Sequence, residues 1–226
     1  MAKRGISLFF ILIFGSSILF GQEIITAEKY LEMVSDNYAG IRDYEASIAI
    51  KSGNNDMAGS VSHLSPSLIR IDFTRPASQV IVFNGNTLTI YLPEFRAVLN
   101  QEINTSRAAG QTLATSQGLS ILRRNYVPSF VTGPNPEPLD SGSNERVVKL
   151  RLSRRSVSEG FREIIICINP DTKLIRRIEG RTIAETEVRF DFTNIKTNLG
   201  IPEARFIYDA PASANMYNNF LFRDSD

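Results

Sequence analysis

Residues 79–92 read Gln-Val-Ile-Val-Phe-Asn-Gly-Asn-Thr-Leu-Thr-Ile-Tyr-Leu and predict the type of fold. Two apolar runs flank Asn84-Gly85, and both residues of such a pair accept the positive φ angles of a tight hairpin turn. Upstream, Ile69, Ile71 and Phe73 alternate with other residues in the way that strands do. We therefore expect a mainly β (α+β) fold that is built from antiparallel hairpins.

Strand patterns extend from this hairpin along most of the chain. Roughly ten consecutive strands form a sandwich, a barrel or a strongly curved sheet. Some strands, such as 80–83 and 164–168, are apolar at successive positions, which indicates that helices or an apolar ligand cover both faces. The expected strands lie at about residues 44–50, 57–64, 68–73, 79–83, 88–92, 96–102, 147–152, 161–168, 174–179 and 187–192.

Two segments predict helices. Thr26 can cap a helix that begins at Ala27 and ends at Gly40, with its apolar residues on one stripe. Residues 105–126 lack the period of two, and Gly110 and Gly118 each weaken a helix there by about 1 kcal/mol relative to Ala. This second segment is either a lid over the sheet or a connector that packs on it.

Residues 1–21 have the features of a cleavable signal peptide. Lys3 and Arg4 precede an apolar run at residues 6–14, and we expect cleavage after Gly21. The run is shorter than the ~20 residues that span a membrane, although an uncleaved anchor is the alternative. A lipoprotein signal would place a Cys at the cut to carry the lipid, and none is there. We expect an unanchored periplasmic domain at residues 22–226.

The sequence contains few features of an enzyme, and we expect no catalysis, no metal and no cofactor. His63 is the single histidine, which excludes a multi-histidine metal site, and no phosphate-binding loop or nucleophile elbow is present. The single Cys167 lies in an apolar run and is expected to be a buried structural thiol. Loss of Lys3 and Arg4 changes the formal net charge from +1 to −1, which gives no reason to expect nucleic acid.

A family resemblance begins at residues 66–73, Pro-Ser-Leu-Ile-Arg-Ile-Asp-Phe. Pro76, Asn84-Gly85 and Leu88 follow, and then Tyr91 and Pro93. This pattern resembles the bacterial lipoprotein carrier LolA, and residues 204–211 are similar to the closing motif of that family. The resemblance implies an incomplete antiparallel barrel whose concave apolar face is closed by helices and holds the acyl chains of a lipoprotein.

The resemblance also implies a function and its partners. The protein would shuttle lipoproteins across the periplasm, from an inner-membrane lipoprotein-releasing transporter to an outer-membrane acceptor, as a monomer. The expected ligand-binding residues lie on strands and lid: Ile71, Phe73, Val80, Val82, Leu88, Ile90, Leu92, Leu113, Leu119 and Leu122. The family has a lid-latching Arg where this chain has Ser65, so the latch is absent or supplied elsewhere, with Arg70 as a candidate.

Other functions remain open from the sequence. The same fold could carry a free lipid or glycolipid, or could act as an envelope-stress sensor. A periplasmic hydrolase and a purely structural envelope protein are further alternatives, although the single histidine argues against the hydrolase.

Overall fold

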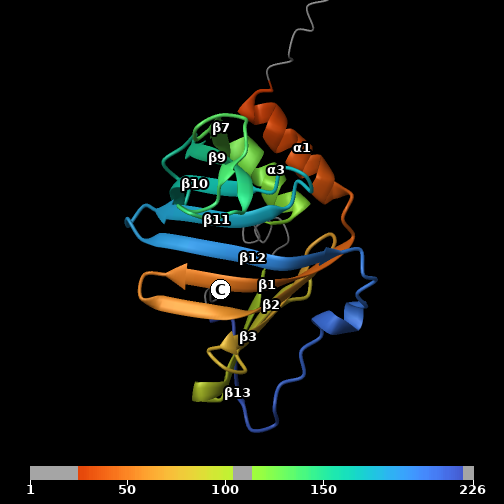
Figure 1. Cartoon of the computed structure of the whole chain (residues 1–226). Coiled ribbons are helices and arrows are strands. Elements are labelled where there is room, and N and C mark those ends of the chain that lie inside the picture. The colour runs from red at the N-terminus through yellow and green to blue at the C-terminus, as the bar shows by residue number, and fades with distance from the viewer. Residues whose placement is uncertain (1–24, 104–113, 221–226) are drawn as a thin grey trace, which may run out of the picture.

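A computed structural model describes residues 25–103 and 114–220, and these form one large sheet with helices on one face (Figure 1). The strand order is β13-β6-β5-β4-β3-β2-β1-β12-β11-β10-β9-β7, and β8 pairs with β9. The strands are β1 (Asp43–Ser52), β2 (Asn55–Leu64), β3 (Leu68–Arg75), β4 (Val80–Phe83), β5 (Thr87–Leu92), β6 (Ala97–Glu102), β7 (Tyr126–Phe130), β8 (Glu137–Pro138), β9 (Arg146–Arg154), β10 (Phe161–Ile168), β11 (Ile175–Thr182), β12 (Glu187–Thr197) and β13 (Asn215–Asn218).

The sheet consists of two meanders that meet in its middle. Strands β1 to β6 follow one another in space as they do in sequence, as do β9 to β12, and β1 pairs antiparallel with β12. The ladders are antiparallel except for that of β13 with β6, which is parallel. The outermost described strands, β13 and β7, do not pair, so the sheet is curved and open. The prediction of a curved antiparallel sheet that forms an incomplete barrel is confirmed.

Gly59 explains part of the curvature. The ladder between β2 and β3 shifts register between Ala58 and Gly59, and such irregularities bend a strand. A Cβ atom at Gly59 would lie 2.2 Å from the carbonyl oxygen of Asp72. Only glycine therefore lets β3 approach β2 this closely at the bend.

Two α-helices lie among the described residues, and both have a side-chain cap at the N-terminus. In α1 (Ala27–Ala39) Thr26 Oγ1 accepts a hydrogen bond from Lys29 N at 3.2 Å, and in α3 (Ser116–Asn125) Thr115 Oγ1 accepts one from Gly118 N at 3.0 Å. The hydroxyl of Tyr38 accepts a hydrogen bond from Ile175 N at 3.0 Å and so fastens α1 to β11. The predicted early helix is confirmed, and α3 is the described helical part of the predicted 105–126 segment.

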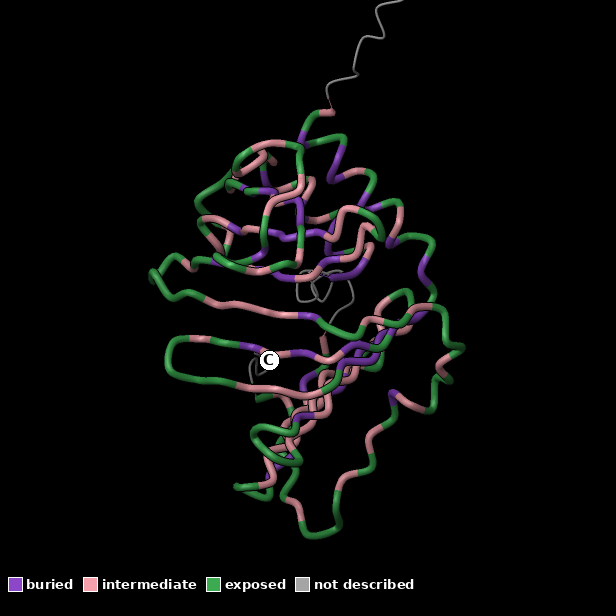
Figure 2. Tube along the Cα trace, viewed as in Figure 1, coloured by how far each residue is buried: buried purple, intermediate pink, exposed green. Residues whose placement is uncertain are grey.

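The helices define the two faces of the sheet. We call the face that α1 and α3 cover the inner face, and the opposite one the outer face. One buried cluster joins the helices to inner-face side chains from β1 through β3 on one side and from β9 through β12 on the other. Figure 2 shows these buried positions mainly around α1 and the strands beside it. Because one cluster reaches both meanders, the sheet curves around the inner face.

Candidate apolar binding site

The inner face carries a row of apolar side chains across strands β3 to β6. Directly opposed residues of neighbouring strands share a face, and the register pairs Ile71 with Ile81, Ile81 with Ile90, and Ile90 with Leu99. A second row pairs Phe83 with Leu88. These side chains face the same side as the helix-covered residues of β1, because Ile71 also pairs with Val61, which pairs with Ala46.

These rows are only partly buried. Ile71, Ile81, Phe83, Leu88, Ile90, Leu92 and Leu99 are all of intermediate exposure. On the same face of β9 and β10, by contrast, the side chains of Leu150, Leu152 and Ile166 are 0% exposed. Apolar side chains that stay partly accessible on a curved face are the expected lining of an apolar binding site.

The structure separates the predicted strand residues into two sets. Five of them lie on the inner face: Ile71, Phe73, Leu88, Ile90 and Leu92. Val80 and Val82 lie on the outer face instead, because Val80 is opposite Asp72 and Val82 is opposite Arg70. They do not share a face with the other five, so we leave them out of the candidate site.

The predicted lid residues have different positions. Leu119 and Leu122 are buried to 0% and 2% exposure in the same core cluster as Phe73, and Ile71 packs against that cluster from its margin. Leu113 lies outside the described residues. The strongest described contacts of α3 are with α1 and β7, at the β7 end of the sheet.

The sequence-based prediction missed Ile81, Phe83 and Leu99. In the run Val80–Phe83 every residue is apolar, so alternation alone does not distinguish the two faces. The neighbouring strand does contain a signal. Since Arg70 and Asp72 on β3 cannot share a face with the apolar Ile71 and Phe73, whichever β4 residues lie opposite those two charges must be on the outer face.

A buried polar group ties the beginning of α3 to the inner face. The hydroxyl of Tyr44 donates to the carbonyl oxygen of Ala114 at 3.2 Å, and its ring lies 5.1 Å from that of His63. Burial lowers the pKa of His63, only partly opposed by the hydrogen bond with the carbonyl oxygen of Leu68 at 2.9 Å. The histidine is therefore neutral near pH 7 and has a structural position, with Nδ1 donating to Leu68.

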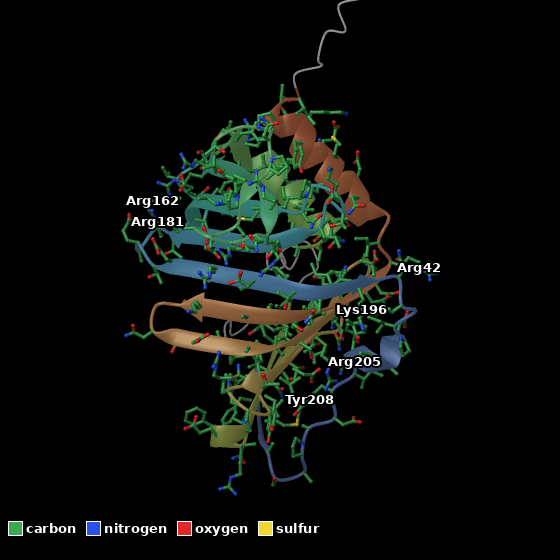
Figure 3. All side chains as sticks on the ribbon, in the orientation of Figure 1. Arg42, Arg162, Arg181, Lys196, Arg205 and Tyr208 are labelled. Carbon is green, nitrogen blue, oxygen red and sulfur yellow. The ribbon has the colours of Figure 1, made fainter. Side chains whose placement is uncertain are left out.

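Arg70, the candidate latch, is on the outer face and holds the C-terminal segment (residues 199–214). Its Nη1 donates to the carbonyl oxygens of Arg205 at 3.2 Å and Ile207 at 3.3 Å, and its Nε to Asp72 at 3.0 Å. Arg205 pairs with the same Asp72, and the ring of Tyr208 stacks near Tyr91 with centroids 5.8 Å apart (Figure 3). Arg70 therefore fastens the segment of η2 (Glu203–Phe206) to the sheet and cannot latch a cover over the inner face.

The outer face of strands β9 to β12 carries charged side chains whose ion pairs stabilise the fold. Asp191 pairs with Arg176, Arg177 and Arg189, and Arg177 also binds Asp140 on the β8–β9 loop through two hydrogen bonds of 2.7 and 3.0 Å. Beneath this loop Cys167 packs with Leu139 and Val147, and burial raises the pKa of its thiol to about 12. A nearby groove of about 620 Å³ is lined mostly by charged side chains, which do not suit an acyl chain.

Two further observations concern the described residues only. They contain no cluster of three or more histidine, cysteine or acidic residues that could hold a metal ion. No helix within residues 25–103 or 114–220 has the length and apolarity that crossing a membrane requires.

Comparison with known proteins agrees with this architecture. The family model of the outer membrane lipoprotein carrier protein LolA matches residues 50–126. An outer-membrane lipoprotein carrier protein from Bordetella avium is 24% identical over 160 residues, which are 70% of each chain. One from Dechloromonas aromatica is 22% identical over 159 residues, again 70% of each chain.

Solved structures share the fold at low sequence identity. An uncharacterized conserved protein from Thermus thermophilus superposes with a TM-score of 0.56 and 14% identity, over 85% of this chain and 98% of that one. MucB gives 0.53 and 17%, over 81% of this chain and 63% of MucB. The Mycobacterium tuberculosis lipoprotein LppX gives 0.51 and 11%, over 78% and 97%. The fold is that of an open β half-barrel covered by helices. In sequence, the chain is similar to the LolA family over residues 50–126, which contain the motifs of residues 66–93.

Proposed function

We propose that this protein is a periplasmic carrier that binds the acyl chains of lipoproteins on the inner face of β3 to β6. The supporting observation is the row of partly exposed apolar side chains that Ile71, Ile81, Ile90 and Leu99 form across four strands. Each buried CH₂ contributes ~0.8 kcal/mol, so acyl chains in water gain strongly from such a face.

A carrier must also release its cargo, and the division of the molecule suits that need. The buried cluster around α1 and α3 has no fully buried member from β4 to β6, so it can keep the fold when the acyl-binding part is empty. The chain would receive lipoproteins from an inner-membrane releasing transporter and pass them to an outer-membrane acceptor. In this proposal residues 1–21 are removed on export, and residues 22–226 act as one monomeric domain without catalysis or cofactor.

The first experiment identifies the bound molecule. The full-length gene is expressed, and the exported protein is purified without detergent and analysed by mass spectrometry. We expect an acylated peptide or lipoprotein to be bound. A free lipid or glycolipid alone would favour the second candidate, a lipid carrier or envelope-stress sensor on the same fold. Protein that carries no lipid and takes up none would contradict both candidates.

A matched pair of variants tests which face binds. Val80 and Ile81 are neighbours on β4 with similar intermediate exposure, but they lie on opposite faces. We expect Ile81→Asn to weaken binding of a fluorescent acyl probe by about tenfold or more, because it places an amide among the acyl chains. We expect Val80→Asn to change the affinity by about twofold or less. Circular dichroism checks that both variants are folded, and equal effects would contradict the proposed face.

A further inference from the structure

The strand β13 is an unusual edge of this sheet. It pairs with β6 through four residues, Asn215 to Asn218, and is the one parallel neighbour among the described strands. Backbone hydrogen bonds mark both ends of the contact: Asn215 N donates to the oxygen of Arg96, and Asn219 N to that of Asn100, each at 2.8 Å. In Figure 1 the dark-blue C-terminal chain passes η2, turns at the lower end of the view and returns to this edge.

Little besides the backbone holds β13 in place. All four of its residues are exposed, and Met216 and Tyr217 keep 60% and 52% of their surface accessible. The described side-chain hydrogen bond to its partner strand joins Asn100 Nδ2 to Asn218 Oδ1 at 3.2 Å. Burial of apolar surface is the main stabilising term in such contacts, and no apolar side chain of β13 is fully buried. It is therefore the strand of this sheet that can leave most easily.

The strand beneath it is different. On β6 the side chains of Ala97, Val98 and Gln101 are buried to 7%, 1% and 3% exposure, so β6 stays with the sheet when β13 leaves. Leu99 of β6 ends the apolar row of the candidate site, and Tyr217 is opposite Leu99. The edge covered by β13 is thus the border of the proposed acyl-binding face.

We propose that β13 is a replaceable edge strand, and that the peptide following the acylated residue of a lipoprotein pairs with β6 in its place. This inference rests on the proposed function. When the acyl chains of a lipoprotein lie on the inner face, its polypeptide must leave that face, and β6 is the strand at the border of the face. Added strands bind through main-chain hydrogen bonds, which do not depend on sequence. That property suits a carrier of many different lipoproteins.

The test fixes β13 to β6 by a disulfide. Asn100→Cys with Asn218→Cys joins the two strands on the outer face, away from the apolar row, because Asn100 pairs with Thr89 there and the two asparagines are hydrogen-bonded. The matched control, Thr89→Cys with Asn100→Cys, joins β5 to β6 and leaves β13 free. The native Cys167 is buried, which keeps it out of the cross-linking.

Two synthetic probes separate the acyl group from the peptide. One is a triacylated cysteine, and the other is the same acylated cysteine followed by nine residues of extended peptide. We expect the wild type and the control disulfide to bind the peptide-bearing probe at least about tenfold more tightly than the short one. The oxidised β13 disulfide should remove this difference and leave the affinity for the short probe unchanged, and reduction should restore it.

Hydrogen exchange provides an independent readout on the unmodified protein. With the peptide-bearing probe bound, amides of residues 215–219 should exchange faster and those of residues 97–100 should stay protected. Tight binding of both probes without a difference, or a difference that survives the oxidised β13 disulfide, would overturn the inference alone. Failure of both probes to bind would overturn the proposed function and the inference with it.

Discussion

The two meanders of the sheet present similar apolar strands to the same inner face but bury them to different degrees. In the closed half, β7 and β9 to β11, the side chains of Leu150, Ile166 and Ile175 are 0% exposed, because α1 and α3 pack at this end. In the open half, β3 to β6, residues such as Ile81 and Ile90 remain partly exposed. An apolar strand pattern therefore does not by itself show whether a face is buried. Within the described residues, the buried half is the one on which α1 and α3 pack.

The largest expected effect contrasts the two halves directly. Leu150→Ala leaves a cavity in the closed half and should lower the free energy of unfolding by about 3 kcal/mol or more. Ile90→Ala in the open half should lower it by about 1 kcal/mol or less, because that side chain is already partly in contact with water. Urea titration measures both variants, and equal losses would contradict the division into halves.

The second prediction concerns the ion pairs behind the closed half. Asp191 is 15% exposed and faces three arginines, one of which, Arg177, is only 7% exposed. Asp191→Ala leaves these charges undercompensated and should cost about 2 kcal/mol in thermal or urea unfolding. Glu187→Ala is the control, since its side chain is 83% exposed and pairs with Arg181 at 3.9 Å. We expect that variant to remain close to the wild type, and a matching loss would argue against burial as the cause.

A smaller effect is expected behind the open half, where the C-terminal segment is fastened. Arg205→Ala removes the pairing with Asp72 and should cost about 1 kcal/mol or less. The exchange of amides in residues 199–208 should become faster, while those of β9 to β11 stay unchanged. Lys196→Ala, at an exposed position on β12 (Figure 3), is the control. Faster exchange throughout the molecule would contradict a local role for this contact.

The smallest effect is a dependence on pH. Burial by itself raises the pKa of Asp72, but hydrogen bonds from Arg70 and Arg205 outweigh burial and bring the pKa below its ordinary value of 3.8. A carboxyl with a lowered folded-state pKa stabilises the fold above its unfolded-state pKa, and this contribution is lost as the pH falls through the folded-state value. The protection of amides in residues 199–208, taken relative to their intrinsic exchange rates at each pH, should therefore be constant from pH 7 to about 5 and weaker below about 4. Asp72→Asn should lose this acid-dependent step, and a persisting step would assign it to another group.

The sequence was informative about local structure and about the family, and much less so about faces and edges. Asn84-Gly85 placed the β4–β5 hairpin, and the stripe from Tyr30 to Tyr38 placed α1, because both signals depend on neighbouring residues. Val80 and Val82 were assigned to the wrong face because a wholly apolar strand has no alternation, so its orientation depends on register with β3.

The strands at the edges of the sheet could not be predicted from the sequence, for a related reason. Residues 215–218 are not among the strands expected from the sequence, whereas the structure has the exposed strand β13 there. The strand β7 contains Pro128 and begins at Tyr126, where the predicted helical segment ends; it is not among the strands expected from the sequence. Such short strands form because they pair with a neighbouring strand, β6 for β13 and β9 for β7. The residues of that neighbour are distant in the sequence, so the local pattern does not predict the pairing. The role of Arg70 on the outer face depends in the same way on the distant residues 205 and 207.

The pairing of β1 with β12 has a consequence for the order of folding. Ile48 lies opposite Phe192, so the centre of the sheet joins the beginning of the domain to a strand near its end. Contacts between residues so distant in sequence are slow to form, because the entropy cost of closing a long loop comes before the contacts stabilise the fold. A chain that emerges on the far side of a membrane with its N-terminus first would have to wait for β12 before its two meanders could unite. Under the export proposed above, the sheet would become complete only after β12 and the strands that follow it have crossed.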